Sequence, residues 1–176
     1  MGIVTGDVFG SDQIGVFLAV VGNTVFHPLE LEQDVVETIE STLELETKGI
    51  LIGGSRLIGS LLAGNSKGIA VADLATERDI DELTSYGDVV VMESGINTAG
   101  NLLVCTDHGV LASPDLPDEG LAILGDVMQV DIGCTTVAGQ SIVGSLAAAN
   151  NKGILLHPDV RSEEIEIIQQ VMDVPP

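Results

Sequence analysis

The sequence predicts an α+β protein in which several ββαβ-type units close into a propeller-like ring. Three features of the 176 residues indicate this. Similar segments follow one another at a near-constant period, the same Gly-containing turn recurs in them, and each segment continues into a short amphipathic stretch. The central glycines of the four segments are 44, 41 and 44 positions apart: Gly15, Gly59, Gly100 and Gly144. Periods of this length are typical of repeat architectures.

Each unit is expected to open with a β-hairpin. A short apolar run follows the central glycine, as in 60–63 and 145–149, and is long enough for a buried strand. The turns 65–68 and 150–153 place Asn and Gly where positive φ is needed, and a second apolar run follows each of them. Proline should end that run in three units because it cannot donate to a strand ladder: Pro28, Pro114 and Pro158.

A short helix is expected next, with apolar residues three or four positions apart on one face. In the fourth unit this face is Ile165, Ile168 and Met172, after Ser162, and in the second unit Thr76 precedes a similar stripe. Helices this short are marginal alone, so the stripe should pack on the sheets. The glycines at the start of each first strand should mark a close approach of backbones near a common axis.

The charge of the chain is strongly negative. Asp and Glu number 27 against 6 Lys and Arg, for a formal net charge of −21, although 45% of the residues are hydrophobic and the chain should fold. Near 1 M salt the Debye length falls to about 3 Å and screens most of the repulsion, which favours a salt-rich, halophilic cytoplasm. Direct binding of nucleic acid phosphates is disfavoured, because it requires a stripe of Lys and Arg.

The remaining composition argues against several other classes. Cys105 and Cys134 have no C-x-x-C spacing, so neither a disulfide framework nor a metal site is expected, and no cofactor motif stands out. The Gly-rich segment 64–68 lacks the phosphate-loop pattern and is expected to be a hairpin turn. The longest apolar stretches, such as 14–21, are shorter than the roughly 18 residues of a membrane-spanning helix. A cytoplasmic location follows as the expectation.

Several strings resemble the archaeal form of the translation initiation factor six family. They are Gly-Ser-Arg-Leu-Ile-Gly-Ser-Leu-Leu-Ala-Gly-Asn-Ser-Lys-Gly from Gly54, the segments 97–101 and 136–139, and His157-Pro158-Asp159. The likeness runs in order over essentially the whole chain. It implies a pentein fold of five units around a pseudo-five-fold axis. Four units are expected here, at about 1–47, 48–94, 95–134 and 135–176 of a single repeat domain. Truncation before the fifth unit is the expected cause, and the alternatives are a genuine four-unit ring and an assembly with another chain.

The resemblance also implies a function. Such a protein is not an enzyme; it binds the large ribosomal subunit, mainly through ribosomal proteins of the L14 and L24e type, and prevents association with the small subunit. A role in large-subunit biogenesis is a further implication. Residue by residue, the contact surface would include Arg56, Ser60, Asn101, Ser145 and Leu146. The family often has a basic residue in place of Ser60 and an aromatic one in place of Leu146.

Each of these positions has an ordinary alternative. Asn101 could satisfy the backbone of its own turn, and Arg56 could be a solvated surface residue. A different class of function is a guanidine-modifying hydrolase or transferase on the same ring, with Cys105 as nucleophile near Asp107 and His108. That chemistry needs a base within hydrogen-bond reach of the thiol. Cys105 could equally be a small buried apolar residue, and self-assembly as a structural repeat protein is a third possibility.

Overall fold

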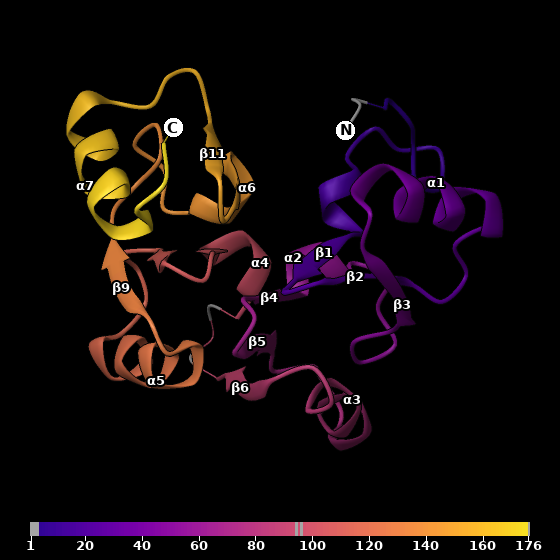
Figure 1. Ribbon diagram of the computed structural model, residues 1–176. Coiled ribbons are helices and arrows are strands. Elements are labelled where there is room, and N and C mark those ends of the chain that lie inside the picture. The colour runs from indigo at the N-terminus through magenta and orange to yellow at the C-terminus, as the bar shows by residue number, and fades with distance from the viewer. Residues whose placement is uncertain (1–3, 94, 96, 176) are drawn as a thin grey trace.

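A computed structural model describes residues 4–93, 95 and 97–175 and arranges four units around a common centre (Figure 1). Each unit has a short helix, two strands and an outer helix, and three of them add a third strand. Unit one contains η1 (Ile14–Val16), β1 (Ala19–Val21), β2 (Thr24–Pro28), α1 (Gln33–Leu43) and β3 (Glu46–Ile50). Unit two contains α2 (Ile58–Leu61), β4 (Leu62–Gly64), β5 (Gly68–Ala72), α3 (Glu77–Leu83) and β6 (Asp88–Met92). Unit three contains α4 (Ala99–Leu102), β7 (Leu103–Cys105), β8 (Gly109–Ala112), α5 (Asp118–Met128) and β9 (Asp131–Cys134). Unit four contains α6 (Val143–Leu146), β10 (Ala147–Asn150), β11 (Gly153–Leu156) and α7 (Ser162–Met172).

The sheets share one topology, and the α+β class is confirmed. The first two strands of each unit pair antiparallel across the expected turn, and the third strand pairs parallel with the second. Strands β10 and β11 form a two-stranded sheet within the described residues. Strand β3 runs on to Ile50, beyond the boundary expected near 47, because it completes the sheet of unit one.

The start of each unit differs from the expectation. The apolar runs 60–63 and 145–149 do not begin as strands, because their first residues belong to the helices α2 and α6. Periodicity cannot separate a short helix from a strand in so few residues. In the outer helices, the expected cap at Thr76 is confirmed, with Asp79 in a capping box, whereas Ser162 is the first helical residue and not the cap.

The central glycines meet at the centre of the ring, as expected. A Cβ atom added to Gly59 would lie 2.0 Å from the carbonyl oxygen of Gly15, and one added to Gly100 would lie 1.9 Å from that of Gly59. Gly144 approaches the carbonyl of Gly100 in the same way, at 2.1 Å. Each unit therefore contacts the preceding one backbone to backbone, at a distance that excludes every side chain larger than hydrogen.

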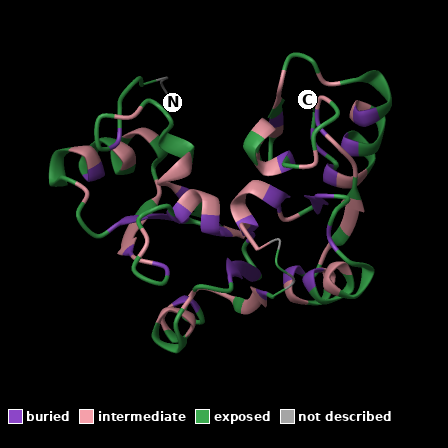
Figure 2. Ribbon diagram, turned by 180° about the vertical axis from the view of Figure 1, so that it is seen from behind, coloured by how far each residue is buried: buried purple, intermediate pink, exposed green. Residues whose placement is uncertain are grey.

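The hydrophobic core lies between neighbouring units. Three clusters join units one and two, two and three, and three and four, and buried segments concentrate on the central strands (Figure 2). Two positions contribute to the core at each boundary. They are the third residue of the second strand and the residue before the central glycine of the next unit. Both are fully buried at all three boundaries: Phe26 and Ile58, Ala70 and Ala99, and Leu111 and Val143.

The two ends of the array are open. Leu155 of unit four, at the strand position that is buried elsewhere, is 78% exposed, and Ile14 of unit one is 44% exposed. On the same side of unit one, α1 exposes Leu43, whereas Met128 and Met172 at the ends of α5 and α7 are fully buried. The described residues form no core cluster between units four and one. Equivalent residues of different units therefore differ in burial, because a neighbouring unit covers some of them and not others.

The hairpin turns are linked to one another at the far end of the strands. The Asn65 side chain donates to the carbonyls of Thr106 and Met128 in unit three, at 3.1 and 2.9 Å, and its oxygen accepts from the backbone of its own turn. Asp107 accepts from the backbone N–H of Ser66, and its own N–H donates to Asn151. The turns thus connect units two, three and four in sequence.

Asn65→Ala should lower the free energy of unfolding by about 2–3 kcal/mol, because two buried carbonyls lose their donor. Asn150, the equivalent residue of unit four, is exposed and accepts from its own turn. Asn150→Ala should therefore cost about 1 kcal/mol or less. Urea unfolding of both variants measures the difference, and equal losses would contradict the role of Asn65 as a link between units.

Candidate functional site

The short helices at the start of each unit form one end of the ring. Residues of η1, α2, α4 and α6 line a cavity of about 490 Å³ on the axis, together with the first residues of β10 and the end of β11. We refer to this cavity and its lining as the axial rim. Four of the five site residues predicted from the sequence belong to it: Ser60, Asn101, Ser145 and Leu146. The structure therefore brings together residues that are far apart in the sequence.

Asn101 and Ser145 contact each other across the boundary between units three and four. The Ser145 hydroxyl donates to Asn101 Oδ1 at 3.2 Å. Among the described hydrogen bonds, the Asn101 side chain makes none with its own turn, which was the alternative interpretation. Its amide nitrogen remains available at the rim, and the side chain is half-buried.

Arg56 lies apart from the other four. It follows the hairpin turn 52–55, and its guanidinium carbon lies 4.9 Å from the ring centroid of Phe9 in unit one. Phe9 in turn packs edge-on against Phe17. A cation over an aromatic face is stabilised by the ring quadrupole, so the guanidinium of Arg56, although exposed, contacts a residue of the neighbouring unit.

The sequence prediction did not include two exposed apolar residues that lie immediately before the rim helices. Leu57 and Ile142 precede α2 and α6 and are 44% and 45% exposed. The two residues occupy the same position in units two and four. Their recurrence immediately before the helical turn was a usable signal, since single exposed apolar residues are common but seldom repeat at one structural position.

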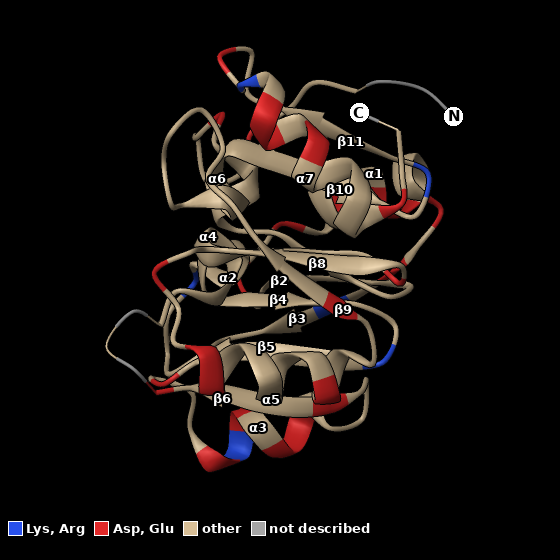
Figure 3. Ribbon diagram, turned by 90° about the vertical axis from the view of Figure 1, so that its left-hand side faces the viewer, with Lys and Arg blue, Asp and Glu red and all other residues tan. Residues whose placement is uncertain are grey.

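The axial rim carries no formal charge, in contrast with the rest of the protein. Figure 3 shows Asp and Glu along the outer helices α3, α5 and α7. None of the residues that line the rim cavity is Asp, Glu, Lys or Arg. In a chain with a net charge of −21, this surface can approach an acidic or basic partner without desolvating a charge.

Two carboxylates, one buried and one half-buried, hold the hairpin turns beside the rim. Glu164 of α7 is 3% exposed, and its two oxygens accept from the hydroxyl of Thr136 and from three backbone N–H groups, those of Ala138, Gly139 and Arg161. Burial alone would raise the pKa of Glu164, but these hydrogen bonds outweigh it and lower the pKa to about 2. Asp79 of α3 accepts from the N–H of Gly53 and of Thr76 in the same way, and its pKa is also lowered.

Cys105 is not assembled with a base. Its side chain lies on β7, in the wall of a second axial cavity formed by the central strands, and burial raises the pKa of the thiol to about 12. His108 is exposed on the following turn, and Asp107 is engaged with Ser66 and Asn151. No hydrogen bond joins Cys105 to His108 in the described part of the chain. The thiol is therefore protonated at neutral pH, which is unsuitable for a nucleophile.

The structure also bears on metal binding and on membrane spanning. Within residues 4–93, 95 and 97–175, no group of three or more His, Cys, Asp and Glu side chains is placed to hold a metal ion. No helix in that part of the chain has the length and apolar character needed to cross a bilayer.

Comparison with known proteins gives a consistent family. A family model described as "eIF-6 family" matches residues 3–176 of the chain. The chain is 38% identical over 135 residues to the translation initiation factor 6 of Methanothermobacter thermautotrophicus, covering 76% of this chain and 61% of that protein. For the proteins of the same name from Methanospirillum hungatei and Halobacterium salinarum the identities are 33% and 32%, over 71% and 74% of this chain and 57% and 60% of the relatives. The chain thus spans about 60% of the length of these curated relatives.

Proposed function

Because the chain belongs to the eIF-6 family, we propose that it is a translation initiation factor that binds the large ribosomal subunit and keeps the small subunit from joining it. One observation supports this most directly. In a strongly acidic protein, four of the five residues matched to the family's contact surface gather on one uncharged face, the axial rim.

The rim suits a protein that acts by occupying a surface. A stable contact needs roughly 800 Å² on each partner and a face that keeps its shape. The carboxylates of Asp79 and Glu164 fix the hairpin turns beside the rim, and the glycine contacts fix the short helices. We expect the partners to be ribosomal proteins of the L14 and L24e type with little direct nucleic-acid contact, since the charge of −21 would repel RNA phosphates. A role in large-subunit biogenesis is part of the same proposal.

We also propose that the complete ring contains a fifth pentein unit between units four and one. The exposed Leu155 and Ile14 support this, because the equivalent residues meet at every other boundary. A salt-rich cytoplasm is the proposed site of action, since high salt screens the acidic outer helices.

Co-sedimentation with purified ribosomal subunits at about 0.1 M and 1 M KCl tests the function, with thermal unfolding recorded at both salt concentrations. The protein should pellet with large and not with small subunits. The double variant Asn101→Ala/Leu146→Ala should weaken binding at least about tenfold. Lys152→Ala, on the β10–β11 turn at the opposite end of its strands, is the matched control and should bind normally.

Equal pelleting with both subunits, or none with the large one, would refute the anti-association role. A double variant that binds like the unaltered protein would leave the function intact and remove the axial rim as its site. A melting temperature that does not rise with KCl would argue against the salt-rich cytoplasm.

A further inference from the structure

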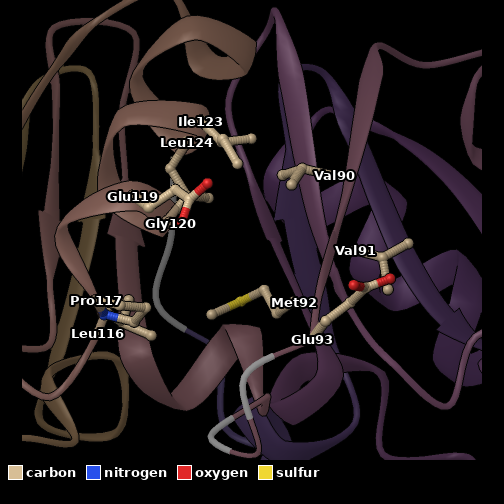
Figure 4. Close-up of a pocket in the computed structure, with 10 residues that line it drawn as sticks. All are labelled: Val90, Val91, Met92, Glu93, Leu116, Pro117, Glu119, Gly120, Ile123 and Leu124. Carbon is tan, nitrogen blue, oxygen red and sulfur yellow. The ribbon is translucent and has the colours of Figure 1, made fainter.

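A groove of about 390 Å³ lies between strand β6 of unit two and helix α5 of unit three, on the periphery of the ring (Figure 4). Its floor is apolar and nearly buried, since Met92, Leu116 and Leu124 are 7%, 7% and 3% exposed. Ile123, at the mouth, is much more exposed, and the Glu119 side chain lies beside the opening, whereas the Glu93 carboxylate points to the same side as Val91, away from the groove (Figure 4). The volume and lining fall in the range of sites that take a side chain or a small ligand.

In unit three the outer helix lacks a side chain that units two and four have at the same position. The third residue of the outer helix is Asp79 in unit two and Glu164 in unit four, and both side chains fill the space beside the neighbouring hairpin turn. In α5 this residue is Gly120. A Cβ atom there would meet only ordinary contacts with Pro117, at 3.5 Å and beyond, so the position has room for a side chain.

The corresponding spaces at the other boundaries are covered. Between units three and four, Val171 of α7 packs onto Gly133 of β9, where an added Cβ would lie 2.1 Å from a methyl carbon. Between units one and two, the ion pair of Lys48 and Glu82 bridges β3 and α3 at 2.6 Å. The groove beside β6 is therefore a particular feature of one boundary and not a general property of the repeat.

The backbone of β6 borders the groove. Val90 and Met92 face it, whereas the Val91 side chain points away from it in Figure 4 and packs on the core between units one and two. Val91 is nevertheless among the residues that line the groove, so it contributes its main chain to the groove wall. Strand β6 is the outer strand of its sheet, and the described hydrogen bonds give residues 89–92 no main-chain partner other than β5. An open strand edge accepts an extended peptide by main-chain pairing.

We propose that this groove binds an extended segment of a partner protein, in which an apolar side chain enters the groove and a flanking Lys or Arg residue pairs with Glu119. The apolar floor selects the central side chain, the edge of β6 supplies main-chain hydrogen bonds, and the Glu119 carboxylate sets the charge of the flanking residue. The site is separate from the axial rim and does not depend on the proposed ribosome contact.

The probe is a capped peptide with the sequence Lys-Val-Leu-Val-Lys, titrated into the isotope-labelled full chain and followed by NMR. Saturable shift changes should map to residues 88–93 and 116–124. Replacing the lysines of the peptide by glutamates, or methylating its backbone nitrogens, should weaken binding at least about tenfold, since each removes one of the proposed interactions.

Protein variants separate the groove from non-specific attraction by an acidic surface. Gly120→Leu fills the groove and should weaken binding at least about tenfold, and Glu119→Gln should weaken it about threefold. Glu163→Gln is the matched control, because Glu163 is exposed and occupies in α7 the helix position that Glu119 occupies in α5. It should bind normally.

Three results would overturn the proposal: no saturable binding, shift changes that lie elsewhere, or a Glu163→Gln loss as large as that of Glu119→Gln. Urea unfolding of Gly120→Leu verifies that this variant is folded. Full affinity in a folded Gly120→Leu would also overturn it. The outcome of the ribosome sedimentation does not bear on any of these measurements.

Discussion

Gly100→Ala is expected to lower the free energy of unfolding by about 3 kcal/mol or more, a large fraction of the stability of a small domain. The new methyl group would lie 1.9 Å from the carbonyl oxygen of Gly59 and 2.9 Å from that of Leu62. Both obstacles are backbone atoms, so no side-chain rotation relieves the overlap. Helix α4 could accommodate the methyl only by moving away from α2, which would open the core between units two and three.

Gly15→Ala is the matched control for this prediction. Gly15 is the equivalent residue of unit one, and a Cβ atom there would have nothing within 4 Å. This substitution should change stability by less than about 1 kcal/mol, in either direction, because it also restricts the unfolded chain. Chemical unfolding monitored by circular dichroism measures both. Similar losses for the two variants would contradict the assignment of the glycines to close contacts between units.

Glu164→Gln is expected to cost about 3 kcal/mol at pH 7. The pKa of Glu164 falls from its ordinary value of 4.5 to about 2 on folding, and each unit of pKa corresponds to about 1.4 kcal/mol. Both carboxylate oxygens accept hydrogen bonds from the turn 138–139 or its surroundings. A glutamine has a single acceptor oxygen, and its amide nitrogen would face N–H donors.

The pH dependence provides an independent measurement. Because the folded pKa is depressed, the stabilisation by Glu164 is complete above about pH 5 and is lost as the pH falls toward 2. The stability difference between the unaltered protein and Glu164→Gln should therefore shrink from pH 5 to pH 2, while other carboxylates contribute equally to both. Glu163→Gln, at an exposed neighbouring position, should show little difference at any pH. A difference that stays constant with pH would refute the role of the ionised carboxylate.

Most of the site was predictable from the resemblance to the family, which supplied Ser60, Asn101, Ser145 and Leu146. Each of them lies one or two positions after a repeat glycine, and the structure brings these positions together at the axis. The packing of Arg56 on Phe9 was not predictable, because the two residues lie in different units and neither belongs to a motif. The groove beside β6 was missed for a similar reason. Only a comparison with Asp79 and Glu164, at the same position of their helices, shows that Gly120 leaves space there.

By itself, the sequence determined the repeat, its turns, the amphipathic outer helices, the family and the need for glycine at the unit centres. These follow from periodicity and, for the central glycines, from the close approach of backbones that only a residue without a side chain allows. The tertiary structure alone decided which of the equivalent residues are buried. Ile14 and Ile58 occupy the same position and have the same side chain, yet one is 44% exposed and the other fully buried. Burial depends on whether a neighbouring unit lies against the residue, and that neighbour comes from another part of the chain.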